Sequence, residues 1–110
     1  MKPIVLAVAL AAGAALSLPA LAKGNPENGK AKSQTCAACH GADGAKPTAP
    51  ENPILAGQHE DYLARALADY QSGKRKNPVM KSMVEKLSRQ DIADLAAWFA
   101  SQNSPLKSSR

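Results

Sequence analysis

The sequence is poor in aromatic side chains and in cysteine. Its 110 residues include one Phe, one Trp and two Tyr, and only two Cys. A domain of this size buries only about 60% of the surface that its unfolded chain exposes, so its core is marginal. Small domains with a weak core usually depend on a metal ion, on disulfides or on a cofactor. We therefore expect a stabilising group of this kind, and the two cysteines limit the choice.

Long apolar runs are lacking after the first part of the chain. Residues 4–18 are almost entirely apolar, follow Met1-Lys2 and lead into Ala20-Leu21-Ala22. This pattern is typical of a secretory signal, and the run is too short for a membrane span. We expect residues 1–22 to be cleaved and residues 23–110 to form a single exported domain. An uncleaved N-terminal anchor is the alternative.

Acidic residues are outnumbered by basic ones. There are 9 Asp and Glu against 14 Lys and Arg, which gives a formal net charge of +5, or +4 once Lys2 is removed with the signal. A modest positive excess favours docking to acidic protein surfaces. No motif combines basic and aromatic residues, which argues against nucleic acid as a partner. With no later apolar stretch to enter a membrane, we expect the mature chain to be soluble in the periplasm.

The two cysteines stand in the motif Cys36-Ala37-Ala38-Cys39-His40. C-x-x-C-H is the attachment site of haem c. Two thiols separated by two residues on a helical turn match the two vinyl groups, to which they add as thioethers. The histidine that follows is placed beneath the ring, where a neutral imidazole is a good ligand for iron. The motif therefore predicts one covalent haem c held by Cys36 and Cys39, with His40 as the proximal ligand.

Other interpretations of the cysteine pair fit less well. In an exported protein two cysteines ordinarily form a disulfide, and this alternative stays open. A redox dithiol of the thioredoxin type needs a βαβ pattern, and the chain has none. A zinc site needs two further ligands, whereas the sequence contains no other cysteine and one other histidine, His59.

Apolar periodicity predicts an all-α domain, with no strand-like alternation and no internal repeat. We expect three main helices, over residues 26–36, over residues 59–72 and from Ser88 onward, and a short helical turn over residues 79–86. The loop over residues 46–53 holds three prolines. Loops of this length are unusual in a small domain, and a large flat cofactor would give them something to wrap around.

Capping residues and apolar stripes support these helices. Asn25 before Pro26 predicts a helix start, and Ser88 with Asp91 three residues on predicts a capping box. Gly73 is expected to end the middle helix. The two stripes consist of Leu63, Ala66, Leu67 and Tyr70 in the middle helix and of Ile92, Leu95, Ala96 and Phe99 in the last.

Three side chains are candidates for the distal face of the iron: Met80, Met83 and His59. Met80 follows Pro78, which fixes the backbone before it, and Met83 projects from nearly the same face of a helical turn. A methionine is more often core filler, so the haem motif is what favours Met80 as ligand. A thioether favours ferrous iron and raises the reduction potential. A six-coordinate iron leaves outer-sphere electron exchange and no site for a substrate.

The chain resembles a class I cytochrome c, most closely the small bacterial kind that also occurs as tandem di-haem proteins. Four features carry the resemblance: the C-x-x-C-H motif, Pro53-Ile54-Leu55-Ala56-Gly57-Gln58, Asn77-Pro78-Val79-Met80, and Leu87-Ser88 leading into residues 91–99. The resemblance implies the cytochrome c fold, with three main helices and long loops around one covalent haem. The single haem motif matches a single-domain form.

The resemblance also implies roles for particular residues. Met80 matches the family's distal ligand, and Pro53 matches the proline whose carbonyl accepts the ring N–H of the proximal histidine. Gly29 and Trp98 match the positions where the first and last helices cross. Ala66 departs from the family, which often has glutamine there, and this puts any polar contact of that glutamine in doubt.

We expect a monohaem electron carrier between redox proteins, and not an enzyme. The alternative is the haem-bearing electron-transfer subunit of a periplasmic dehydrogenase or oxidase. Lys74-Arg75-Lys76 precede the distal-ligand segment, and they are either a solvated loop or a docking patch for acidic redox partners near the haem edge.

Overall fold

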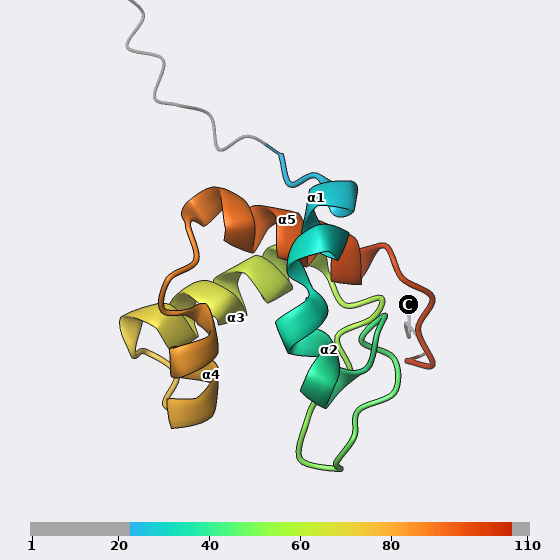
Figure 1. Ribbon diagram of the computed structural model, residues 1–110, viewed down its shortest axis with the longest axis horizontal. Coiled ribbons are helices and arrows are strands. Elements are labelled where there is room, and N and C mark those ends of the chain that lie inside the picture. Colours follow the sequence, from blue (N-terminus) through green and yellow to red (C-terminus); the bar gives the residue numbers. More distant parts are fainter. Residues whose placement is uncertain (1–22, 107–110) are drawn as a thin grey trace, which may run out of the picture.

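The computed structural model describes residues 23–106 and builds them from helices and loops, with no strand in that part of the chain (Figure 1). The helices are α1 Pro26–Lys32, α2 Gln34–His40, α3 Glu60–Ser72, α4 Pro78–Val84 and α5 Arg89–Ala100. The predicted all-α class is confirmed. None of these described helices is long and apolar enough to span a membrane. The predicted signal peptide, residues 1–22, lies outside the described residues.

Helices α1 and α5 cross at a glycine. Gly29 is buried, and a methyl group in its place would overlap the Asp94 carbonyl oxygen and lie 2.7 Å from Cβ of Trp98. Only a residue without a side chain allows the two backbones to come this close. The crossing expected at Gly29 and Trp98 is confirmed, and it brings the beginning of the fold against its last helix (Figure 1).

The predicted first helix is interrupted at Ser33. Both the amide and the hydroxyl of Ser33 donate to the carbonyl of Lys30, at 3.2 and 2.8 Å. These bonds tighten the chain into a turn and compete with a continuous helical ladder. A new helix, α2, then begins at Gln34 and ends at His40. The expectation of one helix to Cys36 is therefore wrong, and the whole cysteine motif lies within α2.

The two predicted caps are confirmed. The side chain of Asn25 accepts the amides of Glu27 and Asn28 at the start of α1. Ser88 and Asp91 form the expected capping box of α5, with each side chain accepting the other's backbone amide. Each cap satisfies amides that the first helical turn leaves without partners, so the limits of α1 and α5 are set by local sequence.

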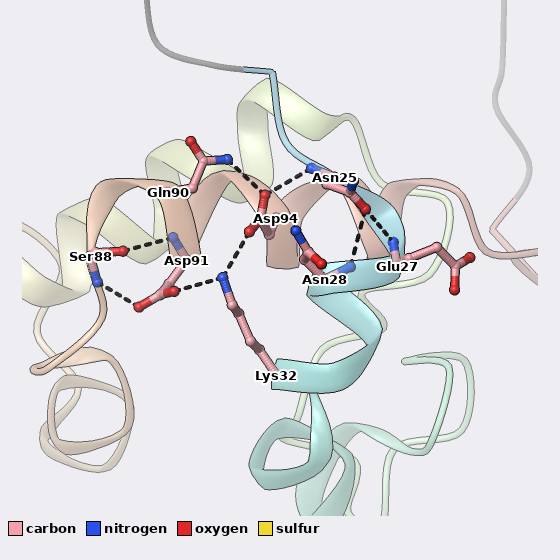
Figure 2. Close-up of polar contacts among 8 residues, drawn as sticks. All are labelled: Asn25, Glu27, Asn28, Lys32, Ser88, Gln90, Asp91 and Asp94. Atoms are coloured by element: carbon pink, nitrogen blue, oxygen red, sulfur yellow. Dashed lines mark hydrogen bonds and ion pairs between the residues drawn. The ribbon is translucent and has the colours of Figure 1, made fainter.

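A polar network that the sequence analysis missed ties α1 to α5 (Figure 2). Asp94 is only 1% exposed. Its carboxylate accepts from the backbone N–H of Asn25, from Lys32 Nζ and from Gln90 Nε2, at 2.7–2.8 Å. Lys32 Nζ also lies 2.7 Å from the Asp91 carboxylate. A buried carboxylate needs such a set of donors. The network therefore fixes the register of α1 on α5.

We expect this network to weaken in acid. Bonds from Lys32 and from the Ser88 amide lower the pKa of Asp91 to about 2, and bonds from the Asn25 amide and from Lys32 lower that of Asp94. A carboxyl whose pKa is depressed by folding stabilises the protein above its unfolded value of 3.8, and that stability is lost as the pH falls toward 2.

Asp94→Asn should lower the free energy of unfolding by about 2 kcal/mol at neutral pH, because a neutral amide cannot replace the charge-assisted bonds. The variant should also lose part of its acid dependence below pH ~4. Urea unfolding at both pH values measures this. The matched control is Asp69→Asn, whose pair with the exposed Arg65 spans 3.9 Å and should contribute little. Equal losses in the two variants would contradict a special role for the buried network.

The core lies between α3 and α5. Leu63, Leu95, Ala96 and Phe99 form its buried cluster, and Ile92 is also buried, so the predicted stripe of α5 is confirmed. The predicted stripe of α3 faces inward as a unit: Leu63 is buried in the core, Leu67 packs against it, and the whole stripe lines a neighbouring cavity.

The long loop between α2 and α3 is held against the cysteine motif. The Cys39 carbonyl accepts from the Thr48 amide, the Thr48 hydroxyl and Asn52 Nδ2, at 3.0, 3.3 and 3.2 Å. These bonds fasten the proline-rich segment to the end of α2 and position the residues around Pro53.

Candidate haem site

Helix α2 presents the motif residues on one side. Cys36, Cys39 and His40 stand at positions i, i+3 and i+4 of a helix, which share a face. Both thiols are half-buried and free, with no disulfide between them. Burial raises the pKa of the Cys36 thiol, which reflects the apolar surroundings of its sulfur. The structure thus contains the pair as two separate thiols and not as the alternative disulfide.

His40 is held by the residue that the resemblance indicated. Its side chain is buried, and Nδ1 lies 2.8 Å from the carbonyl oxygen of Pro53. A carbonyl only accepts, so Nδ1 must donate its proton in this bond. In the neutral ring Nε2 then carries the free lone pair. The expected contact between His40 and Pro53 is confirmed, and it fixes the tautomer that a metal ligand needs.

An apolar cavity adjoins His40. Its walls come from α2, from the segment after Pro53, and from the apolar stripes of α3 and α5. The lining residues are Cys36, His40, Pro53, Ile54, Leu55, Gln58, Tyr62, Leu63, Ala66, Leu67, Tyr70, Arg75, Leu95, Ala96 and Phe99. A flat apolar macrocycle fits such walls, with a thiol and a free imidazole nitrogen beside them. The residues present therefore fit the predicted haem.

Arg75 is part of this cavity, although its sequence position indicated only a charged loop. Its guanidinium carbon lies 4.9 Å from the centre of the Tyr70 ring, and Nη1 lies 3.5 Å from the Tyr62 hydroxyl. A guanidinium over an aromatic face is held by the ring's negative potential. Lys74 and Lys76, on either side, are exposed. All three residues of the predicted docking patch are therefore exposed, and Arg75 also lines the cavity.

The three candidates for the distal ligand lie in different places. Met80 is half-buried in α4, and it is not among the described residues that line the cavity. Met83 is 48% exposed. His59 caps α3 and lines another hollow, which it shares with Lys23 and Ala93. His59 is therefore separated from the cavity that His40 borders, while ligation by Met80 stays a prediction.

The zinc alternative receives no support. Among residues 23–106 there is no cluster of three or more His, Cys, Asp or Glu side chains that could bind a metal ion. A protein zinc site usually requires at least three such ligands. The cavity beside His40 is lined by that one imidazole and by one cysteine, Cys36.

Comparison with known proteins gives consistent relatives. The family model of cytochrome c matches residues 26–103. Cytochrome c4 of Pseudomonas aeruginosa is 51% identical over 81 residues, which are 74% of this chain and 40% of that protein. Cytochrome c-554(548) of Halomonas halodenitrificans is 43% identical over 82 residues, which are 72% of this chain and 98% of that protein.

A solved structure agrees with these relatives. The crystal structure of reduced recombinant cytochrome c4 from Pseudomonas stutzeri matches with a TM-score of 0.70 and 40% identity, over 76% of this chain and 48% of that one. The chain thus spans about half or less of the cytochromes c4 that it matches, and nearly all of cytochrome c-554(548). With the family model matching most of its length, this chain belongs to the cytochrome c family, whose cofactor is covalently bound haem c.

Proposed function

We propose that this protein is a single-electron carrier with one haem c, attached through Cys36 and Cys39. The observation that carries the proposal is the bond from His40 Nδ1 to the Pro53 carbonyl, at 2.8 Å, beside an apolar cavity. It leaves Nε2 as the only free nitrogen of the ring, next to a motif thiol. We assign His40 as the proximal iron ligand and Met80 as the distal one.

Bound haem iron supplies one-electron exchange between its ferrous and ferric states. The chain's own residues determine what else is possible. His40 and Met80 together would fill both axial positions, so neither oxygen nor a substrate could bind the iron. Apolar walls formed by residues such as Leu67 and Phe99 would exclude water from a ring bound in the cavity. We therefore propose outer-sphere electron transfer and no catalysis.

A periplasmic location follows from the proposed signal peptide, because residues 1–22 have the composition of an export signal. In that compartment the protein would exchange electrons with other redox proteins. The alternative is a bound electron-transfer subunit of a periplasmic dehydrogenase or oxidase. Copurification with a larger partner at constant stoichiometry would favour the subunit.

Carbon monoxide binding tests whether protein ligands occupy both axial positions of the iron. Two protein ligands should prevent carbon monoxide from binding rapidly to the reduced protein. A redox titration of the protein should follow a one-electron curve. The protein should also retain its pigment after acid-acetone extraction, because thioether bonds are covalent. Rapid carbon monoxide binding would instead indicate an open iron site, and with it an enzyme or a gas sensor.

Exposed lysines suit a docking surface for acidic partners. Lys74 and Lys76 flank Arg75, which itself lines the haem cavity, so positive charge lies next to the cavity wall. Charge at such a place steers an acidic partner toward the site of electron exchange. Because Arg75 also contacts Tyr62 and Tyr70, a clean test leaves Arg75 unchanged.

The double variant Lys74→Glu, Lys76→Glu should slow electron exchange with a carboxylate-coated electrode by about tenfold at low ionic strength. The difference should disappear in high salt, which screens the charges. The control is Lys23→Glu, Lys30→Glu, which changes the net charge equally at exposed positions outside the cavity lining. Equal slowing in both double variants would mean that net charge, and not the site, determines the rate.

A further inference from the structure

One glutamine joins α3 to the far end of α4. Gln71 lies in the last turn of α3, and its Nε2 donates to the carbonyls of Val84 and Leu87, at 2.9 and 2.7 Å. A primary amide has two N–H donors, and both are used here. The two carbonyls belong to the end of α4 and to the turn before α5, where a helix leaves acceptors without intrahelical partners.

Helix α4 depends on such outside contacts. It has seven residues, which is too short for a helix to be stable alone in water. It packs against α3 at the edge of the molecule (Figure 1). Val84 is its one buried residue, while Val79 and Met83 are 60% and 48% exposed. Its start is capped locally by Asn77, which fixes the first turn but does not join α4 to another helix.

We propose that Gln71 is the positioning residue of the distal ligand: its amide holds α4 on α3 and thereby keeps Met80 in place for the iron. Val84 and Gln71 together fix the C-terminal end of α4, one by burial and the other by two directed bonds. Met80 lies one helical turn earlier in the same short helix. Rotation or fraying of α4 would move the sulfur of Met80. This inference rests on the proposed ligation by Met80.

The test uses Gln71→Leu and Gln71→Glu, which both lack the two donors. Gln71→Glu keeps the size of the half-buried side chain but adds a charge, whereas Gln71→Leu adds none, so the result does not depend on one kind of change. Imidazole binds the ferric iron only when the methionine has left. Its apparent affinity should therefore rise by about tenfold or more in both variants. The far-red band of the methionine–ferric bond should also fade at a lower temperature than the far-UV signal of the helices.

The matched control is Gln102→Leu. Gln102 Nε2 also donates to a backbone carbonyl, that of Trp98 at 3.0 Å, but beyond the end of α5. This variant should leave imidazole affinity unchanged, and its far-red band should disappear only with global unfolding. Wild-type imidazole affinity in both Gln71 variants would overturn the positioning role of Gln71 but would not contradict ligation by Met80. Absence of the far-red band from the wild-type protein would overturn Met80 ligation and the inference together.

Discussion

Serine at both Cys36 and Cys39 should abolish covalent attachment of haem. A serine oxygen does not form the thioether bond, so the purified double variant should have the mass of its polypeptide alone. Pigment, if any remains, should be extracted by acid-acetone. Covalent haem per chain should fall by at least about tenfold, and the domain should lose stability because few large apolar side chains support its core. Mass spectrometry and the extraction measure both effects.

Ala37→Ser provides the control for this experiment. It changes a residue between the two cysteines and leaves both sulfur atoms in place. Its mass should include one haem, as in the unchanged protein. A double serine variant that still carried a covalent macrocycle would contradict attachment through this motif, and so would an unchanged protein with no added mass.

Met80→Ala should remove the far-red band of the ferric protein and lower the reduction potential by hundreds of millivolts, within the range of about 0.8 V that axial ligands span. The reason is the softness of the thioether, which stabilises ferrous iron relative to ferric iron. Loss of Met80 also opens the distal face, so carbon monoxide should bind the reduced variant rapidly. An optical spectrum and a redox titration of the variant test both expectations.

Met83→Ala is the matched control, three residues further along α4. Met83 is 48% exposed, and its removal should leave the band and the potential close to those of the unchanged protein. The assignment is wrong if the band disappears in Met83→Ala and survives in Met80→Ala. Survival of the band in both variants would mean that neither Met80 nor Met83 produces it.

Features governed by neighbouring residues were predicted from the sequence. Asn25 and Ser88 cap helices through bonds to amides within three residues of them, so a short motif contains the whole interaction. The apolar stripe of α5 likewise follows from helical spacing alone. The Gly29 crossing and the Pro53 carbonyl join distant segments, and these came from the resemblance to a family.

Features that depend on a distant partner were missed where no motif marks them. No role was predicted for Asp94, because its burial is explained only by its donors from Asn25 and Lys32. Gln71 gave no signal, because its partners are backbone carbonyls that exist only once α4 is folded. The break at Ser33 was not predicted, because a serine within a helical pattern interrupts the helix only when its hydroxyl bonds to a preceding backbone carbonyl. Here that carbonyl belongs to Lys30.

The crossing of α1 and α5 has a consequence for how substitutions near it affect the redox site. Gly24, ahead of α1, packs so closely on α5 that a methyl group there would lie 3.0 Å from Cβ of Ala97. Lys23, Gly24, Ala100 and Ser101 line one shared hollow. The residues just before α1 therefore lie beside the C-terminal end of α5, and none of these four residues borders the haem cavity. Substitutions at this end of the α1–α5 pair should therefore change the packing of the two helices without reaching the walls of the redox site.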